Sequence, residues 1–482
     1  MFSDATCTFF LSGKTPSKTL VLIFRKTKYG WKIEQNVPYT SFLIDLLGLL
    51  GMSYLNSIVF IVLAFFVGLS PNCFSTPNSS ALIADRIIDG ISQKPLTGSA
   101  ILTKDEKIID IVSENSIPDG YIITRFDGMT LMPGLINGHE HPLLHLDDYQ
   151  NGHLQVSSAY KALLGLATMQ RWLQHGWTTI RVMGDGDVFY GNQDIRRAIE
   201  EGVFVGPRIT GAAHYISITG GGGDINFLSP EQSVIADGLI ADGPEEIRKA
   251  IRTEIKYGSD WIKIMVTGAF HTVGDDPKNV AFSDEELSAA IAEAGRHNIP
   301  VAAHAHAATG INKAVRAGVR SIEHGTYLND ESIRLMVRNG TYYVPTIYVG
   351  DYYAGTGKLL AQEKNDDPYL SYREEWLDNI KKAHVAGVKV VVGVDLGGYA
   401  IEPHVYAREF ATLIEAGLSP MDAIKAGTSV AAEMLRWEDR VGAIRSGLLA
   451  DIIAVDGNPL EDISTLEQPT FVMIGGQIVR QP

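Results

Sequence analysis

The stretch LMPGLINGHEHPLLH, residues Leu131–His145, runs from an apolar segment through a break at Pro133 and Gly134 to two closely spaced histidines. Alternate side chains of a β-strand point to one face, so His139 and His141 can converge on one point where the strand ends. Two converging imidazoles suit a metal ion, although an isolated pair of this kind more often only caps a strand. The rest of the chain has to decide between these interpretations.

The composition is that of a globular protein with a large core. The chain has 482 residues, of which 45% are hydrophobic and 20% charged, which is enough for more than one domain. Its 56 acidic residues outnumber its 41 basic ones and give a formal charge of −15. This balance argues against a nucleic-acid partner, because phosphate binding requires a basic surface.

The N-terminal segment differs from the rest of the chain. Residues 1–51 are interpreted as an upstream extension and residues 52–80 as a signal-like leader, in which Leu55–Leu69 reads LNSIVFIVLAFFVGL. The leader predicts export to the periplasm or the exterior. A membrane anchor is the alternative, although the apolar run is shorter than the ~20 residues of a comfortable span. Membrane contact is expected only through an uncleaved leader.

Cysteine occurs only in this N-terminal segment, at Cys7 and Cys73. The body of the chain therefore has no disulfide framework, no thiolate metal site and no cysteine nucleophile. Any metal bound there must be held by His, by carboxylates or by a modified Lys.

Short alternating strands lie at both ends of the body. Residues 81–133 contain LIADRIIDG, SAILTKDEKIIDIVS and GYIITRFDGMTLMPG, bounded by Gly, Asp and Pro, and residues 447–482 show the same pattern. We expect these two segments to form one small β-sandwich domain.

Residues 134–446 predict an α/β fold, a (β/α)8 TIM barrel. After the strand that ends at His139, seven further β-branched runs alternate with helical stretches: TTIRVMGD, PRITGAA, DWIKIMVTG, PVAAHAH, RSIEHGT, YYVPTIYV and KVVVGVD. Strands separated by helices indicate βαβ units, and eight of them match a barrel with insertions.

Six polar residues fall at equivalent places in these strands. His139 and His141 end strand 1, Lys263 lies in strand 4, and His304, His324 and Asp395 end strands 5, 6 and 8. The carboxyl ends of barrel strands meet at one mouth, which is where barrel enzymes keep their active sites. The joint arrangement favours a metal site over six unrelated strand caps.

The motifs GHEH, WIKIMVTG, AAHAHA, IEHGT and GVD resemble those of the metal-dependent amidohydrolase superfamily, over residues 82–482. The segments ITGGGGD and VTGAFHTVGDDPKNVAFSDEEL are similar to the binuclear branch that contains Xaa-Pro dipeptidases, imidazolonepropionase-like proteins and ochratoxin-hydrolysing amidases. The motifs are specific for the superfamily and less so for the branch.

The resemblance implies a ligand set for two divalent metal ions. His139, His141 and Asp395 would hold one ion, His304 and His324 the other, and an N-carboxylated Lys263 would bridge them. Zn2+ is the first choice for such ligands, and Mn2+ or Co2+ also fit. Independently, a lysine inside an apolar barrel has a lowered pKa, and its neutral amine can take up CO2. Pairing of Lys263 with a core acid is the alternative.

The resemblance further implies hydrolysis of an amide bond by a metal-bridging hydroxide, with Asp395 moving the proton. The expected substrate is a small-molecule amide, a dipeptide or an N-acyl amino acid such as Xaa-Pro. Alternatives are a cyclic-amide hydrolase, an amidase of N-acyl aromatic amino acids, and a non-catalytic binding module. The HAHA run disfavours a mononuclear deaminase, and a homo-oligomer is left open.

Loop residues near the mouth are further candidates. His214 and His271 are expected to act in catalysis, and His271, Tyr215 and Tyr348 to bind substrate; a solvated loop position is the alternative for each. His306 shares a face with His304 but is interpreted as a supporting residue rather than a ligand.

Two other features are set aside. The glycines Gly220–Gly223 lack the lysine and hydroxyl residue of a phosphate loop, so they predict a lid or a tight turn. His145 lies beyond the strand end and is left out of the metal shell.

Overall fold

The computed structural model divides into two compact units, residues 1–76 and residues 77–482, which are described separately. It describes residues 6–12, 19–27, 30–35, 79–144, 149–187, 189–356 and 368–481. The first unit contains an antiparallel sheet in the order β1 (Thr6–Ser12), β2 (Thr19–Thr27) and β3 (Gly30–Gln35). Within the described residues, no helix is both long and apolar enough to cross a membrane.

Residues 52–78 of the leader, with Cys73, lie outside the described residues, so their roles stay predictions. The second unit begins its structure with a strand at Ser79, which includes the last two residues assigned to the leader.

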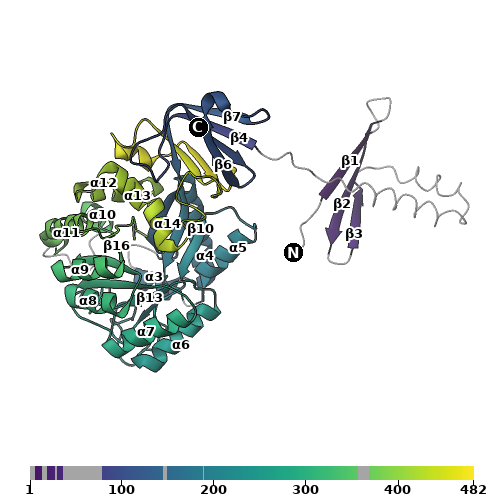
Figure 1. Ribbon diagram of the computed structural model, residues 1–482. Coiled ribbons are helices and arrows are strands. Elements are labelled where there is room, and N and C mark those ends of the chain that lie inside the picture. The colour runs from purple at the N-terminus through teal and green to yellow at the C-terminus, as the bar shows by residue number, and fades with distance from the viewer. Residues whose placement is uncertain are drawn as a thin grey trace, which may run out of the picture. The chain divides into compact units, whose positions relative to one another are not determined.

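Both ends of the second unit contribute to one seven-stranded sheet (Figure 1). Its strands are β4 (Ser79–Ile87), β5 (Ser99–Lys104), β6 (Lys107–Ser113), β7 (Ile122–Pro133), β17 (Ile452–Asp456), β18 (Phe471–Ile474) and β19 (Gln477–Arg480). The order is β19-β18-β17-β7-β4-β5-β6. The predicted β domain is therefore one continuously hydrogen-bonded sheet, built from both ends of the second unit.

The long strand β7 explains this continuity. It pairs in parallel with β4 on one side and antiparallel with β17 on the other, so it joins the two ends of the chain. The domain has its own core, in which the rings of Phe126 and Phe471 meet edge to face at 4.9 Å. The domain boundaries at residues 133 and 447 stay predictions.

The middle of the chain forms the predicted barrel. Its strands are β8 (Leu135–Glu140), β9 (Trp177–Met183), β10 (Arg208–Ala212), β13 (Ile262–Met265), β14 (Val301–Ala307), β15 (Ser321–Tyr327) and β16 (Tyr342–Val344). All of their mutual pairings are parallel, and β11 (Tyr215–Ser217) and β12 (Leu239–Ile240) extend the sheet beside β13.

Backbone hydrogen bonds close the ring at residues 389–394, the predicted eighth strand. Val391 N donates to Tyr343 O of β16 at 2.8 Å, and Gly138 N of β8 donates to Val392 O at 2.8 Å. On the opposite side, the chain just before β13 hydrogen-bonds to β10. The carboxyl ends of all eight strands therefore share one mouth.

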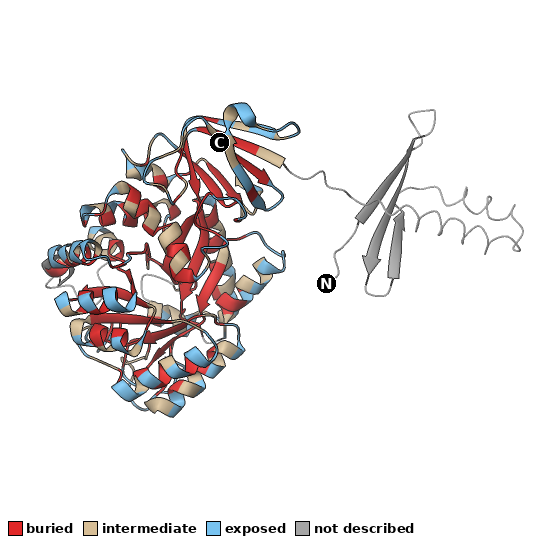
Figure 2. Cartoon of the chain, viewed as in Figure 1, coloured by how far each residue is buried: buried red, intermediate tan, exposed pale blue. Residues whose placement is uncertain are grey.

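Helices cover the outside of the barrel, with their exposed faces outward and the strands buried (Figure 2). They are α4 (Ser158–Gln174), α5 (Gly191–Glu200), α6 (Gly243–Lys256), α7 (Asp284–Arg296), α8 (Ala308–Ala317), α9 (Asp330–Asn339), α11 (Pro368–Val385), α12 (Arg408–Glu415), α13 (Pro420–Ala426) and α14 (Ser429–Leu435). Local signals set their ends: Ser283 and Glu286 form a capping box at α7, and Gly340 ends α9 at φ +67°.

Two short helices, α3 (Tyr149–Gln155) and α10 (Tyr348–Thr356), follow β8 and β16.

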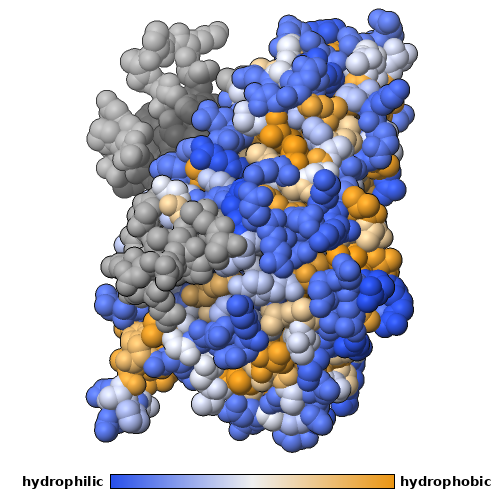
Figure 3. Space-filling model, turned by 90° about the vertical axis from the view of Figure 1, so that its left-hand side faces the viewer, coloured by the Kyte–Doolittle hydropathy of each residue, from blue (hydrophilic) through white to orange (hydrophobic). Residues whose placement is uncertain are grey.

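On the face shown in Figure 3, hydrophobic residues lie in several separate groups between hydrophilic ones.

Candidate metal centre

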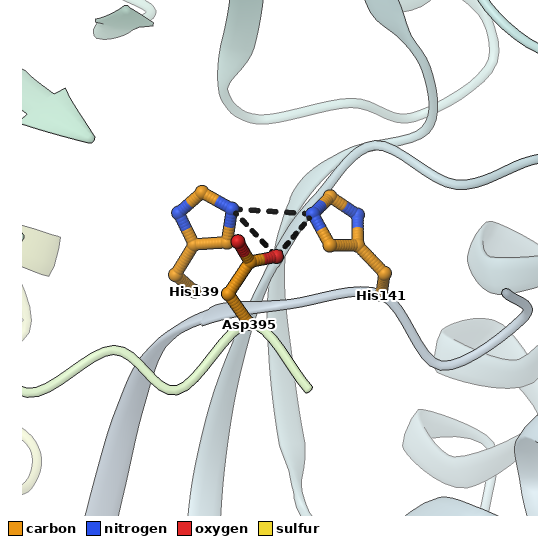
Figure 4. A group of neighbouring side chains, drawn as sticks. All are labelled: His139, His141 and Asp395. Carbon is orange, nitrogen blue, oxygen red and sulfur yellow. Dashed lines mark hydrogen bonds and ion pairs between the residues drawn. The ribbon is translucent and has the colours of Figure 1, made fainter. Parts of the chain in front are cut away.

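Three side chains at the barrel mouth point their ligand atoms toward one another (Figure 4). His139 lies near the end of β8, His141 directly follows this strand, and Asp395 follows the eighth strand. His141 Nε2 lies 3.1 Å from His139 Nε2 and 3.1 Å from Asp395 Oδ1, and His139 Nε2 lies 3.5 Å from the same oxygen. Ligand atoms of a tetrahedral metal are about 3.3 Å apart when the metal–nitrogen distance is about 2.0 Å.

The hydrogen bonds of Nδ1 indicate which nitrogen of each imidazole ring carries the proton. His141 Nδ1 is the donor in its hydrogen bond to Gly184 O, because a carbonyl oxygen can only accept. His139 Nδ1 lies 2.8 Å from Glu323 Oε2. Burial lowers the pKa of His139, whereas for His141 the effect of burial is outweighed by the Asp395 carboxylate, which raises its pKa. With Nδ1 as the donor in two neutral rings, both Nε2 atoms would present lone pairs to each other and to the Asp395 carboxylate. Three acceptors at such short range fit a cation between them.

A buried ion pair fixes His139 from behind. Glu323 and Arg181 are both fully buried, and Arg181 Nη2 donates to both carboxylate oxygens of Glu323 at 2.9 Å. The guanidinium also stacks on Trp261, with its central carbon 4.5 Å from the ring centroid. Sequence reasoning missed this pair. Arg181 could have been found, because it is a charged residue inside the apolar strand TTIRVMGD. The same kind of signal identified Lys263.

Lys263 lies in β13 and lines the cavity at the mouth with only 2% of its surface exposed. Burial lowers the pKa of this lysine to about 8, and the negative charges of Glu323 and Asp395 oppose the shift only in part. A sizeable fraction of neutral amine near neutral pH is what carboxylation by CO2 requires.

His304 and His324, the ligands expected for a second ion, lie beside these three residues. His304 Nε2 lies 3.0 Å from the carbonyl oxygen of Gly268, and His324 Nδ1 lies 2.7 Å from Thr346 Oγ1. The His324 ring centroid is 4.5 Å from that of His304 and 5.0 Å from that of His139. Burial lowers the pKa of His304 to about 3, so this ring is neutral and can act as a ligand.

Strained backbone accompanies these residues. His324, Thr346 and Asp395 have φ values of +68°, +49° and +59°, a region that residues other than Gly rarely adopt. Such conformations persist where surrounding contacts enforce them, and they concentrate at functional sites.

Aromatic residues line the cavity above the six predicted ligands. They are Tyr149, Tyr215, Phe270, Tyr353, Tyr372 and Trp376. The rings of Phe270 and Tyr372 stack with centroids 5.4 Å apart and planes 18° apart. Among the described residues that line the cavity, Lys263 is the only Lys or Arg.

The structure brings three of the other predicted residues to this cavity. His271 is exposed at its mouth, and Tyr215 is buried in its wall with its hydroxyl donating to Asp237. His306 also lines the cavity, with Nδ1 2.8 Å from Thr326 Oγ1.

His214 and Tyr348 are not among the described residues that line this cavity, and their expected roles in catalysis and in substrate binding stay predictions. His214 is buried, and its Nδ1 lies 2.8 Å from Glu254 Oε1 of α6. Tyr348 accepts a hydrogen bond from Arg408 at 3.3 Å through its hydroxyl. Both side chains hydrogen-bond to partners on surrounding helices.

The four glycines Gly220–Gly223 form consecutive turns, closed by a hydrogen bond of 3.0 Å from Gly221 N to Ile218 O. This agrees with the tight turn that was one of the two expectations. His145 lies outside the described residues.

Comparison with known proteins identifies relatives along most of the chain. Residues 130–479 match the model of the amidohydrolase family. An ochratoxinase of Aspergillus niger is 32% identical over 416 residues, which cover 81% of this chain and 84% of the relative. The crystal structure of a Xaa-Pro dipeptidase with bound methionine superposes with a TM-score of 0.76 at 33% identity, covering 83% of this chain and all of that one. The crystal structure of A. niger ochratoxinase gives a TM-score of 0.75 at 29% identity, covering 84% and 96%.

Proposed function

Because the chain belongs to the amidohydrolase family and is a hydrolase of carbon–nitrogen bonds, we propose that it uses two divalent metal ions to hydrolyse the amide bond of a small molecule. The observation that carries the proposal is the convergence of the lone pairs of His139, His141 and Asp395 within 4.8 Å. His304, His324 and carboxylated Lys263 complete the ligand set. Zn2+ suits these nitrogen and oxygen ligands.

Metal ions in such a site lower the pKa of water and polarise a carbonyl group. The chain supplies the proton transfer. Asp395 Oδ1 faces the two histidines of β8, whereas Oδ2 is on the side of His324, 3.7 Å from Nδ1. We assign two steps to Oδ2: it accepts a proton from the attacking water and then gives this proton to the leaving nitrogen. The leaving group departs as a neutral amine.

The cavity favours substrates with an aromatic group. Its wall contains six aromatic side chains, of which Phe270 and Tyr372 stack on each other, and these rings offer apolar area. An N-acyl amino acid with an aromatic acyl group or side chain therefore fits best, which agrees with the similarity to ochratoxinase. Dipeptides of the Xaa-Pro type are the second candidate, on the basis of the similarity to a Xaa-Pro dipeptidase.

Metal content and one variant test the catalytic proposal. The purified protein should bind two equivalents of Zn2+, whereas a non-catalytic binding module would be metal-free. Asp395→Asn should retain much of the metal and lose amide hydrolysis by orders of magnitude. Near-normal turnover of this variant would remove Asp395 from the proton transfer.

A substrate screen tests the specificity. N-acyl-phenylalanines, Xaa-Pro dipeptides and a cyclic amide should be offered to the zinc-loaded protein, and kcat/KM should be highest for the aromatic amides. A preference for Xaa-Pro with a small apolar Xaa would contradict the role of the aromatic wall.

Export through the leader is a separate proposal, based on the apolar run Leu55–Leu69. N-terminal sequencing of the mature protein should find a start after this run. A start before Leu55 would contradict cleavage.

A further inference from the structure

The carbonyl groups of His324 and Gly325 lie at a corner where two successive residues have positive φ values, +68° and +58°. This corner lies inside β15, directly after the last residue that pairs with β16, and sets the direction in which the His324 ring leaves the strand. For His324 the conformation is unfavourable by itself, so neighbouring groups must hold it.

Two aromatic side chains hydrogen-bond to this corner. Tyr343 Oη donates to His324 O at 3.0 Å and lies 3.4 Å from Gly325 O. Trp376 Nε1 lies 3.1 Å from the same His324 oxygen and 3.0 Å from Tyr343 Oη. The indole can therefore donate to the phenol while the phenol donates to the carbonyl, an arrangement in which each bond polarises the next.

The shape of the corner matches this clamp. A Cβ atom on Gly325 would lie 2.6 Å from Cε2 of Tyr343, so the phenol ring packs directly on the glycine. Tyr343 and Trp376 are both buried, on β16 and on α11, and Trp376 also lines the cavity at the barrel mouth. The two side chains thus connect the cavity wall with the backbone of a metal ligand.

We propose that Tyr343 and Trp376 are positioning residues, which hold the His324–Gly325 corner in the conformation that presents His324 to a metal ion. The proposal rests on the proposed function, since it takes His324 to be a ligand. Groups that orient metal ligands typically change metal affinity by about 10-fold to 100-fold when they are removed.

Equilibrium dialysis of the metal-free full-length protein against Zn2+, with elemental analysis, tests the clamp without measuring activity. Tyr343→Phe and Trp376→Phe each leave one hydrogen-bond donor to His324 O. Each variant should therefore lower the affinity for one of the two zinc ions by less than 10-fold. The double variant removes both donors and should lower the affinity for that ion by about 10-fold to 100-fold. This loss should exceed the product of the losses of affinity in the two single variants. The other ion should bind as in the wild type.

Tyr342→Phe is the matched control, because it removes a hydroxyl from the neighbouring position of β16, whose ring lies against Arg320 instead. It should bind both ions normally. Zinc affinities within twofold of wild type for the folded double variant would overturn the proposal, and so would unchanged affinities for both single variants if the double variant does not fold. Failure of the wild type itself to bind two ions would instead overturn the proposed function.

Discussion

The two halves of the proposed metal centre are held by different chemistry. His139 lies in β8 and His141 directly follows it. The ring of His139 contacts a buried carboxylate that pairs with an arginine, and the ring of His141 donates to a carbonyl group. His324 lies on a strained corner and is held by the neutral hydroxyl of Thr346 and by the pair of Tyr343 and Trp376.

This difference separates two kinds of support. Removing one partner of a buried ion pair is strongly destabilising, because the other partner stays in the core as an uncompensated charge. Hydroxyl and indole groups contribute direction and little charge. We therefore expect damage to the first half to affect folding and damage to the second half to affect mainly metal affinity.

The largest effect should follow from Glu323→Gln. Arg181 would lose its carboxylate partner while staying buried, which should lower the free energy of unfolding by about 3–5 kcal/mol. Chemical denaturation measures this loss. Asp194→Asn, which breaks the exposed pair with Arg197, is the matched control and should leave stability unchanged. Equal stability of the two variants would contradict the distinction between the halves.

An intermediate effect is expected for Gly325→Ala. The positive φ alone should cost about 1–2 kcal/mol, and contact with Tyr343 should add to this and weaken zinc binding. Gly340→Ala isolates the first contribution, because Gly340 has φ +67° and no atom within 4 Å of the added Cβ. Thermal unfolding and zinc titration of both variants separate the two contributions. If both variants lose the same stability and bind zinc alike, the clamp does not restrict the corner.

The smallest effect should come from Thr346→Val, which removes the acceptor of His324 Nδ1. Zinc affinity should fall by about 10-fold with little change in stability. Thr326→Val is the control, because Thr326 holds His306 in the same way and His306 is not expected to be a ligand. A comparable loss of zinc in Thr326→Val would make His306 a ligand after all.

Much of this site could be predicted because parallel strands bring their carboxyl ends together. The i, i+2 spacing of His139 and His141 and the apolar surroundings of Lys263 are local signals, and counting strands placed Asp395 beside them. The structure confirms the α/β barrel with an additional β domain.

Side-chain direction in the loops could not be predicted in this way. His214 turns to Glu254 and Tyr348 to Arg408, partners 40 and 60 positions further along the chain. Alternation also predicts strands without their order, so the parallel pairing of β4 with β7 was not foreseen. The support of His324 depends on a positive φ, and no pattern of residue types near IEHGT indicates one.

The sheet of the β domain has a consequence for folding. Thr130 of β7 hydrogen-bonds to Gly457, which lies 327 positions later, just after β17. During synthesis the backbone of β7 therefore exposes an unpaired edge until the whole barrel has been made, and an open edge invites association with other chains. Contacts of such long range also form slowly. We expect chains truncated before residue 452 to aggregate even though every strand of the barrel is present.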